Sequence, residues 1–226
     1  MRFRNLFLWD MRFQARYGFY LLYTFLTILY AAFIFSLPVA AKEKAAPILI
    51  FSDPAAMGLF FMGAIVLLEK SQRVTVFMSI TPVKACEYVA SKVLSLSAIS
   101  VVVAVILATA SGSRSVLPVA VGTLLGSAMF TLCGVIVATR IVSLNQFILA
   151  TVPVEIIGFV PAVFSLFLDL GPIWRFYPPV ACMELISGKE PAAVGIVLTV
   201  LLISVLFFAS CGSVKKMWQE QGGIKI

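Results

Sequence analysis

Glu155 is the one ionisable side chain that lies well inside a long apolar run of this sequence. At 1.5 Å per helical residue it would lie about 13 Å from the cytoplasmic end of that run. A charged acid near the bilayer centre costs about 2.5–3.5 kcal/mol on insertion scales, so Glu155 should face protein or water. Two interpretations stay open: a cation- or proton-sensitive residue on a substrate path, or a protonated carboxyl bonded to a neighbouring hydroxyl.

Two prolines, Pro153 and Pro161, flank Glu155 in the same apolar run. Each proline removes a backbone hydrogen bond, and together they predict a helix that bends or locally unwinds. With Glu155 they form the candidate substrate path. The alternative is ordinary helix packing, because proline is common in membrane helices.

Several kinds of chemistry are missing from the chain. It has no histidine, which excludes Ser–His and H-E-x-x-H active sites. It also has no G-x-x-x-x-G-K-[ST] segment, so it cannot hold ATP phosphates as a P-loop does. The four cysteines show no C-x-x-C spacing, so neither a disulfide framework nor a zinc site is expected. We therefore expect a non-catalytic chain with no metal or cofactor of its own.

Composition indicates an all-α, polytopic membrane protein. Hydrophobic residues make up 62% of the chain, charged residues 12%, and the mean hydropathy is +1.08. A soluble domain is roughly half apolar and a quarter charged, and in a bilayer each helix can satisfy its own backbone. The net charge of +7 does not indicate nucleic-acid binding, because the basic residues lie at the edges of apolar runs.

The apolar runs predict six transmembrane helices in one membrane domain covering 1–226. A bilayer core needs about 20 apolar residues per helix, and the second run is short by that measure. The predicted spans are 18–41, 54–68, 89–110, 116–139, 146–168 and 192–212.

The basic residues predict the orientation of these spans. Twelve Lys and Arg residues fall on the side of the N-terminus and five on the other, which together account for all 17. The richer side is cytoplasmic. Both termini are therefore expected in the cytoplasm, with the chain in the plasma (inner) membrane.

Residues 1–17 predict an interfacial helix along the cytoplasmic leaflet, with its arginines toward anionic headgroups. Asp10 and Gln14 interrupt its apolar arc, and the alternative is a frayed basic tail. The arc itself consists of Phe3, Leu6, Phe7, Phe13 and Tyr17.

Two further segments predict helix packing. The outer loop 169–191 is too apolar for a free loop, which favours short helices dipping into the outer leaflet, with Trp174 and Tyr177 at headgroup level. In the span 116–139, Gly122 and Gly126 form a small-residue stripe that lets helix backbones approach closely. We expect this stripe to pack within one subunit.

The cytoplasmic segment 69–92 combines charges, a short helix and a stop signal. Phe77 and Ile80 give the helix an apolar face, and Thr81-Pro82 ends it because proline disfavours helix at the preceding residue. Taken as residue types alone, this can also be an ordinary inner loop whose charges set the topology.

The order of residues in this segment resembles the permease subunits of ABC-2 type transporters, and most closely those known as fluoroquinolone export permeases. The family commonly has a small residue, usually glycine, where this chain has Arg73. The positions that match the family pattern are Glu69, Lys70, Thr81, Pro82, Glu87, Tyr88 and Lys92.

The resemblance implies an ATP-driven exporter of a hydrophobic or amphipathic compound such as a drug. It implies that 69–82 is a coupling helix that docks on a separate ABC ATPase subunit, which would hold ATP and Mg. It also implies a homodimer of the permease and a partly re-entrant outer segment before the last span. The implied coupling residues are Glu69, Lys70, Arg73, Phe77, Ile80, Thr81, Pro82, Glu87 and Lys92.

Two alternatives to an ABC exporter remain at this stage. One is a proton- or cation-coupled secondary transporter or channel that uses Glu155. The other is a sensory or immunity membrane subunit that has the same architecture but moves no substrate. Transport by the purified chain without an ATPase would favour the first alternative.

Overall fold

The computed structural model describes residues 2–52, 57–113, 116–168 and 171–221, and all of its regular elements in these ranges are helices. The side chains of Arg2 and Gln221 lie outside the description. In chain order the elements are α1 (Arg2–Arg16), α2 (Phe19–Ser36), α3 (Val39–Ser52), α4 (Leu59–Ser71), α5 (Val74–Ile80), α6 (Ala85–Ser111), α7 (Val116–Arg140), α8 (Leu144–Phe167), η2 (Pro172–Phe176), α9 (Pro178–Ile186) and α10 (Ala193–Gln221).

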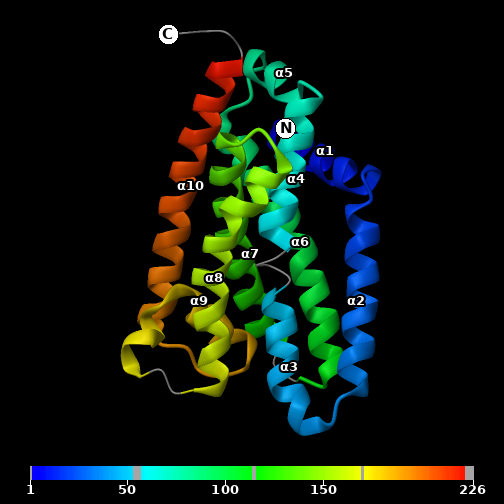
Figure 1. The fold of residues 1–226 in the computed structure, drawn as a ribbon, viewed down its shortest axis with the longest axis vertical. Coiled ribbons are helices and arrows are strands. Elements are labelled where there is room, and N and C mark those ends of the chain that lie inside the picture. The colour runs from blue at the N-terminus through cyan, green and yellow to red at the C-terminus, as the bar shows by residue number, and fades with distance from the viewer. Residues whose placement is uncertain (1, 53–56, 114–115, 169–170, 222–226) are drawn as a thin grey trace.

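The long helices run along the long axis of the molecule (Figure 1). The short helix α5 lies at one end, next to the last turns of α10, and α1 lies toward the same end. We call this the α5 end. The start of α3 and the connections around η2 lie at the opposite end, which we call the α3 end.

Five described helices are long and apolar enough to cross a membrane: α2, α6, α7, α8 and α10. They correspond to five of the six predicted spans. The second predicted span, 54–68, is not among them, because α4 has only 13 residues, and residues 54–56 lie outside the described part. Helices α3 and α4 instead follow one another along the long axis (Figure 1), so the chain returns to the α5 end in two shorter helices.

The first predicted span was too long. Helix α2 ends at Ser36, and Leu37 has an extended backbone with ψ 147°. The following Pro38 disfavours a helical conformation at Leu37, so the helix stops there. Residues 39–41 belong to α3, and so do Lys42 and Lys44, which were expected in a connecting loop.

Helix α7 forms the centre of the bundle, since most of its membrane-spanning residues are buried against other helices. A Cβ atom added to Gly122 would lie 2.9 Å from the carbonyl oxygen of Cys182 in α9. One added to Gly134 would lie 2.9 Å from that of Leu59 in α4. The small residues of α7 therefore admit helices of the same subunit, as predicted for the stripe at Gly122.

The outer segment folds back onto the bundle through α9, whose side chains are largely buried against neighbouring helices. Trp174 and Tyr177 pack edge to face, with ring centroids 5.8 Å apart. Residue Asp169, where the predicted outer loop begins, lies outside the described residues.

Helix α8 runs unbroken through both prolines, so the predicted local unwinding does not occur. Pro161 cannot donate the hydrogen bond that the carbonyl of Ile157 would receive in a regular helix. The hydroxyl of Tyr177 donates to that carbonyl oxygen at 2.9 Å. The outer segment thus supplies a hydroxyl donor in place of the backbone N–H that Pro161 lacks.

Candidate functional site

The segment 69–82 is not one helix, as the sequence predicted, but the end of α4 followed by α5. Arg73 separates the two with a φ of 59°, in the left-handed region. This conformation favours glycine, because other residues crowd their Cβ against the backbone. The resemblance leads us to expect a glycine here, which would relieve that crowding. Arg73 therefore forms the α4–α5 corner at a cost in backbone conformational energy.

Helix α5 presents two large apolar side chains to its surroundings at the α5 end. Phe77 is 64% exposed and Ile80 is 75% exposed. Thr81 has an extended backbone and ends the helix just before Pro82. The placement of Phe77 and Ile80 matches the apolar face expected for this helix.

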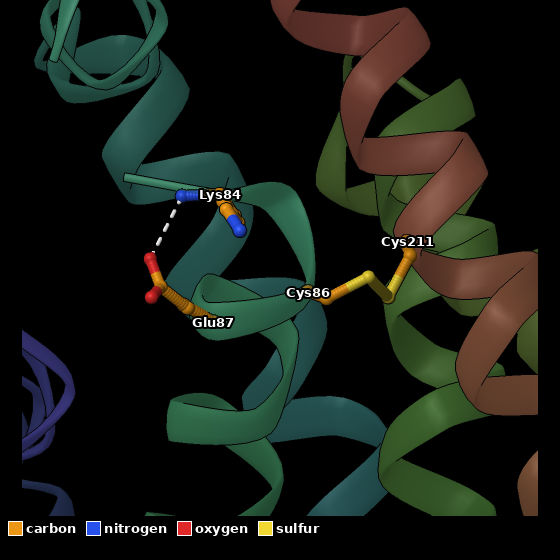
Figure 2. The surroundings of a disulfide bond; sticks show 4 residues. All are labelled: Lys84, Cys86, Glu87 and Cys211. Carbon is orange, nitrogen blue, oxygen red and sulfur yellow. Dashed lines mark hydrogen bonds between the residues drawn. A yellow bond between two sulfur atoms is a disulfide. The ribbon is translucent and has the colours of Figure 1, made fainter. Parts of the chain in front are cut away.

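Glu87 forms part of the start of α6, since its carboxylate accepts a hydrogen bond from the backbone N–H of Lys84 at 2.9 Å (Figure 2). This contact occupies one of the free donors that begin a helix. The structure therefore gives Glu87 a capping role where α5 leads into α6.

Beneath this corner lies a buried ion cluster, which we define as Asp10, Glu69, Tyr88, Ser91 and Lys92. Each of its side chains is at most 1% exposed. The Lys92 ammonium lies 2.5 Å from Asp10 Oδ1 and also pairs with Glu69. Tyr88 donates its hydroxyl to Glu69 at 2.5 Å, and Ser91 donates to Asp10. The cluster thereby joins α1, α4 and α6.

This burial changes the role expected of two coupling residues. Glu69 and Lys92 cannot touch a partner subunit directly, because neither reaches the surface. Burial raises the pKa of the Glu69 carboxyl, against the opposing effect of the Lys92 ammonium. The pair instead fixes the helices on either side of α5.

Lys70 is also held within the chain. Its ammonium donates to the backbone carbonyls of Ala138, Thr139 and Ile141 at 2.7, 3.1 and 2.8 Å. These carbonyls lie at the C-terminus of α7, where a cation is favourable. Burial lowers the pKa of Lys70. Lys70 therefore ties the end of α4 to the end of α7.

A disulfide between Cys86 and Cys211 joins the first turn of α6 to α10 (Figure 2). This single pair was not predicted from the sequence, which argued only against a disulfide framework. The two cysteines are 125 residues apart, yet their Cα atoms lie 4.9 Å apart in the fold. Local spacing carries no information on such a long-range pair.

Comparison with known proteins identifies the family. The sequence profile of the fluoroquinolones export permease protein family matches residues 2–189. The chain belongs to this family. It is 30% identical over 172 residues to fluoroquinolones export permease proteins of two strains of Mycobacterium tuberculosis, CDC 1551 / Oshkosh and ATCC 25618 / H37Rv. The aligned region covers 75% of this chain and 73% of each relative.

Family membership agrees with the resemblance to ABC-2 type permeases that the segment 69–92 carries. The matched residues run from α1 to α9 and include the whole buried ion cluster. The chain is therefore a membrane permease of an export family rather than an enzyme.

Two residues of this permease were missed as site residues. Asp10 and Gln14 looked like flaws in an apolar arc, but both are buried against α6. Gln14 Nε2 donates to Ser95 Oγ at 2.8 Å, one turn beyond the ion cluster. The available signal was their spacing of four residues on the apolar face of α1, matched by Ser91 and Ser95 on α6.

The candidate substrate-path residues of the permease lie apart from the segment 69–82, on α8. Glu155 is partly exposed and borders the buried stripe of Thr151 and Gly158. Pro153 is exposed and Pro161 is half-buried. Within the described ranges, no ammonium or guanidinium group forms an ion pair with Glu155.

Proposed function

We propose that this permease is the membrane subunit of an ATP-driven ABC exporter, and that α5 docks on a separate ATPase subunit. The observation that carries the proposal is the exposure of Phe77 and Ile80 on a short helix beyond the membrane-length helices. Exposed apolar side chains gathered at one end of a protein are typical of a surface that another protein covers. Membership of an export permease family supports the same conclusion.

The contacts around α5 give a route by which movement of the ATPase would reach the membrane helices. Displacement of α5 acts on α4 through the corner at Arg73 and on α6 through Thr81-Pro82. The ion cluster links those two helices to α1, so the three move together. Such rigid-body movement of packed helices would switch the permease between inward- and outward-open states.

The remaining parts of the assembly follow from this proposal. ATP and Mg belong to the ATPase subunit, since this chain has no P-loop. Two copies of the permease form a homodimer in the plasma membrane, with both termini and α5 on the cytoplasmic side. The substrate is an amphipathic or hydrophobic compound, and because the relatives are named fluoroquinolones export permease proteins, a fluoroquinolone is the first to test.

Transport in proteoliposomes tests the function. The permease is reconstituted with and without a candidate ABC ATPase subunit, and movement of the fluorescent fluoroquinolone norfloxacin is followed on addition of Mg and ATP. We expect ATP-dependent transport only when both subunits are present. Transport by the permease alone, driven by a pH gradient, would contradict the proposal and favour a secondary transporter.

A further inference from the structure

A cavity of about 530 Å³ lies at the α3 end of the molecule, away from α5. It is enclosed by the start of α3, the end of α6, the start of α7 and the ends of α8 and α9. This volume is within the range of sites that hold drug-sized molecules. In the orientation proposed above, the cavity faces the outer side of the membrane.

The rim of this cavity is basic. It carries the lysines Lys42, Lys44 and Lys189 against one acid, Glu43. Among the described residues, no carboxylate lies within 4.0 Å of any of the three ammonium groups. The rim therefore holds positive charge that this chain leaves without an ion-pair partner in the described part.

Aromatic rings hold two of these ammonium groups near the cavity. The Nζ of Lys42 lies 5.7 Å from the ring centroid of Phe35, and that of Lys44 lies 5.0 Å from that of Phe167. A ring contact orients a cation but leaves its charge in place, whereas a carboxylate would neutralise that charge. The charge thus remains available to a ligand.

Apolar residues form much of the cavity wall, among them Pro47, Ile50, Val119 and Leu166, together with Ser111 and Ser187. A basic rim above a wall with this apolar surface suits a molecule with one anionic group on a hydrophobic body. The neighbouring cavity beside η2 differs, because its Arg175 is already paired with Glu184 at 3.6 Å and donates to the Glu190 carbonyl.

We propose that the cavity at the α3 end binds an amphiphile whose carboxylate or phosphate lies among Lys42, Lys44 and Lys189 and whose apolar body packs against α3, α7 and α8. The inference rests on the proposed export function, for which it names one class of substrate. It assigns the cavity to the outward side of the transport path.

Binding of a matched pair of fluorescent probes tests this site without any ATPase. The permease is placed in phosphatidylcholine nanodiscs, and empty nanodiscs measure the partition of each probe into lipid. Pyrenebutyrate carries the carboxylate, whereas pyrenebutanol has the same apolar body without the charge. We expect K42Q/K44Q/K189Q to weaken pyrenebutyrate binding about tenfold, from three modest ion pairs, and to change pyrenebutanol binding less than about twofold.

The matched control is K215Q/K216Q, which removes two exposed lysines at the other end of the molecule. It should leave the affinity for both probes unchanged. Elution of each variant as the wild type in size-exclusion chromatography checks that it is folded. Equal affinity of the wild type for the acid and the alcohol, or an unchanged affinity in K42Q/K44Q/K189Q, would overturn the inference.

Nanodiscs containing phosphatidylglycerol separate the two sources of the anionic group. If a lipid phosphate occupies the rim, this lipid will compete with pyrenebutyrate in the wild type but not in K42Q/K44Q/K189Q. Absence of competition assigns the site to a free carboxylate amphiphile. Because binding is measured without ATP, a failure here leaves the ATP-dependent transport result standing, and the reverse also holds.

Discussion

Lys92 on α6 and Asp10 on α1 form an ion pair with an Nζ–Oδ1 distance of 2.5 Å, although neither side chain is more than 1% exposed. Glu69 on α4 is the second acid on the same ammonium. Rings of Trp9, Phe13 and Tyr88 surround the lysine, with centroids 5.1 to 5.7 Å from its Nζ. One cation therefore holds α1, α4 and α6 together beneath α5.

Removing the cation of the buried ion cluster should destabilise the permease strongly. K92M leaves Asp10 and Glu69 buried without their partner, and loss of one member of a buried ion pair costs about 3–5 kcal/mol. Thermal unfolding in detergent, followed by intrinsic fluorescence, measures the loss. The matched control is D10N/E69Q/K92M, which removes all three charges and should recover much of the stability. If K92M unfolds at the wild-type temperature, the cluster does not hold these helices.

The hydrogen bond from the Tyr177 hydroxyl to the Ile157 carbonyl should stabilise the permease, because Pro161 has no backbone N–H to donate to that carbonyl. Y177F is expected to cost about 1 kcal/mol, the net value of a typical hydrogen bond. In a P161A background the backbone N–H can bond Ile157 again, so the same change should cost much less. A double-mutant cycle on thermal stability measures the coupling. Additive effects of Y177F and P161A would show that the two are unrelated.

The Cys86–Cys211 disulfide should be detectable by counting thiols. In protein purified without reductant and denatured in detergent, a maleimide-polyethylene glycol reagent should label the two free cysteines, Cys133 and Cys182. After reduction it should label all four. The variant C86S/C211S should show two labels under both conditions. Four labels on the wild type before reduction would contradict the disulfide.

Glu155 should affect transport according to the charge of the substrate if it lies on the substrate path. E155Q should then slow ATP-dependent transport of cationic compounds more than that of neutral ones, since it removes a carboxylate without changing its size. The measurement compares initial rates in proteoliposomes for a cationic and a neutral dye of similar size. Equal losses for both would assign Glu155 a structural role.

Apolar runs predicted much of the fold, because each membrane helix satisfies its own backbone and shows its length in the sequence. The predicted ends of the spans at 89–110 and 116–139 lie within four residues of α6 and α7. Helix α3 was missed because Lys42, Glu43 and Lys44 look like a loop between spans. They form the first turns of a helix, and the face of that helix that lines the cavity cannot be predicted from a single sequence.

The candidate site was only partly predictable, for the same reason. Phe77 and Ile80 follow from local periodicity, and the structure leaves both exposed. The partnership of Lys92 with Asp10 spans 82 residues, and that of Cys86 with Cys211 spans 125. Such pairs depend on how helices pack, which composition and spacing do not determine. The result is that Glu69 and Lys92, expected at a docking surface, are buried.

The most direct test of the proposed coupling measures how strongly the variant F77D stimulates ATP hydrolysis by the partner ATPase. This change places a charge in the proposed contact of α5, where Phe77 is 64% exposed and its replacement should not disturb the core. The matched control is I173D, since Ile173 is 79% exposed on η2, at the opposite end of the molecule. We expect F77D to reduce the stimulation of the partner ATPase by this permease at least about tenfold, as for an interface hot spot. I173D should keep it, with both variants present in the membrane at wild-type levels. Full stimulation by F77D would contradict the claim that α5 couples this permease to an ATPase.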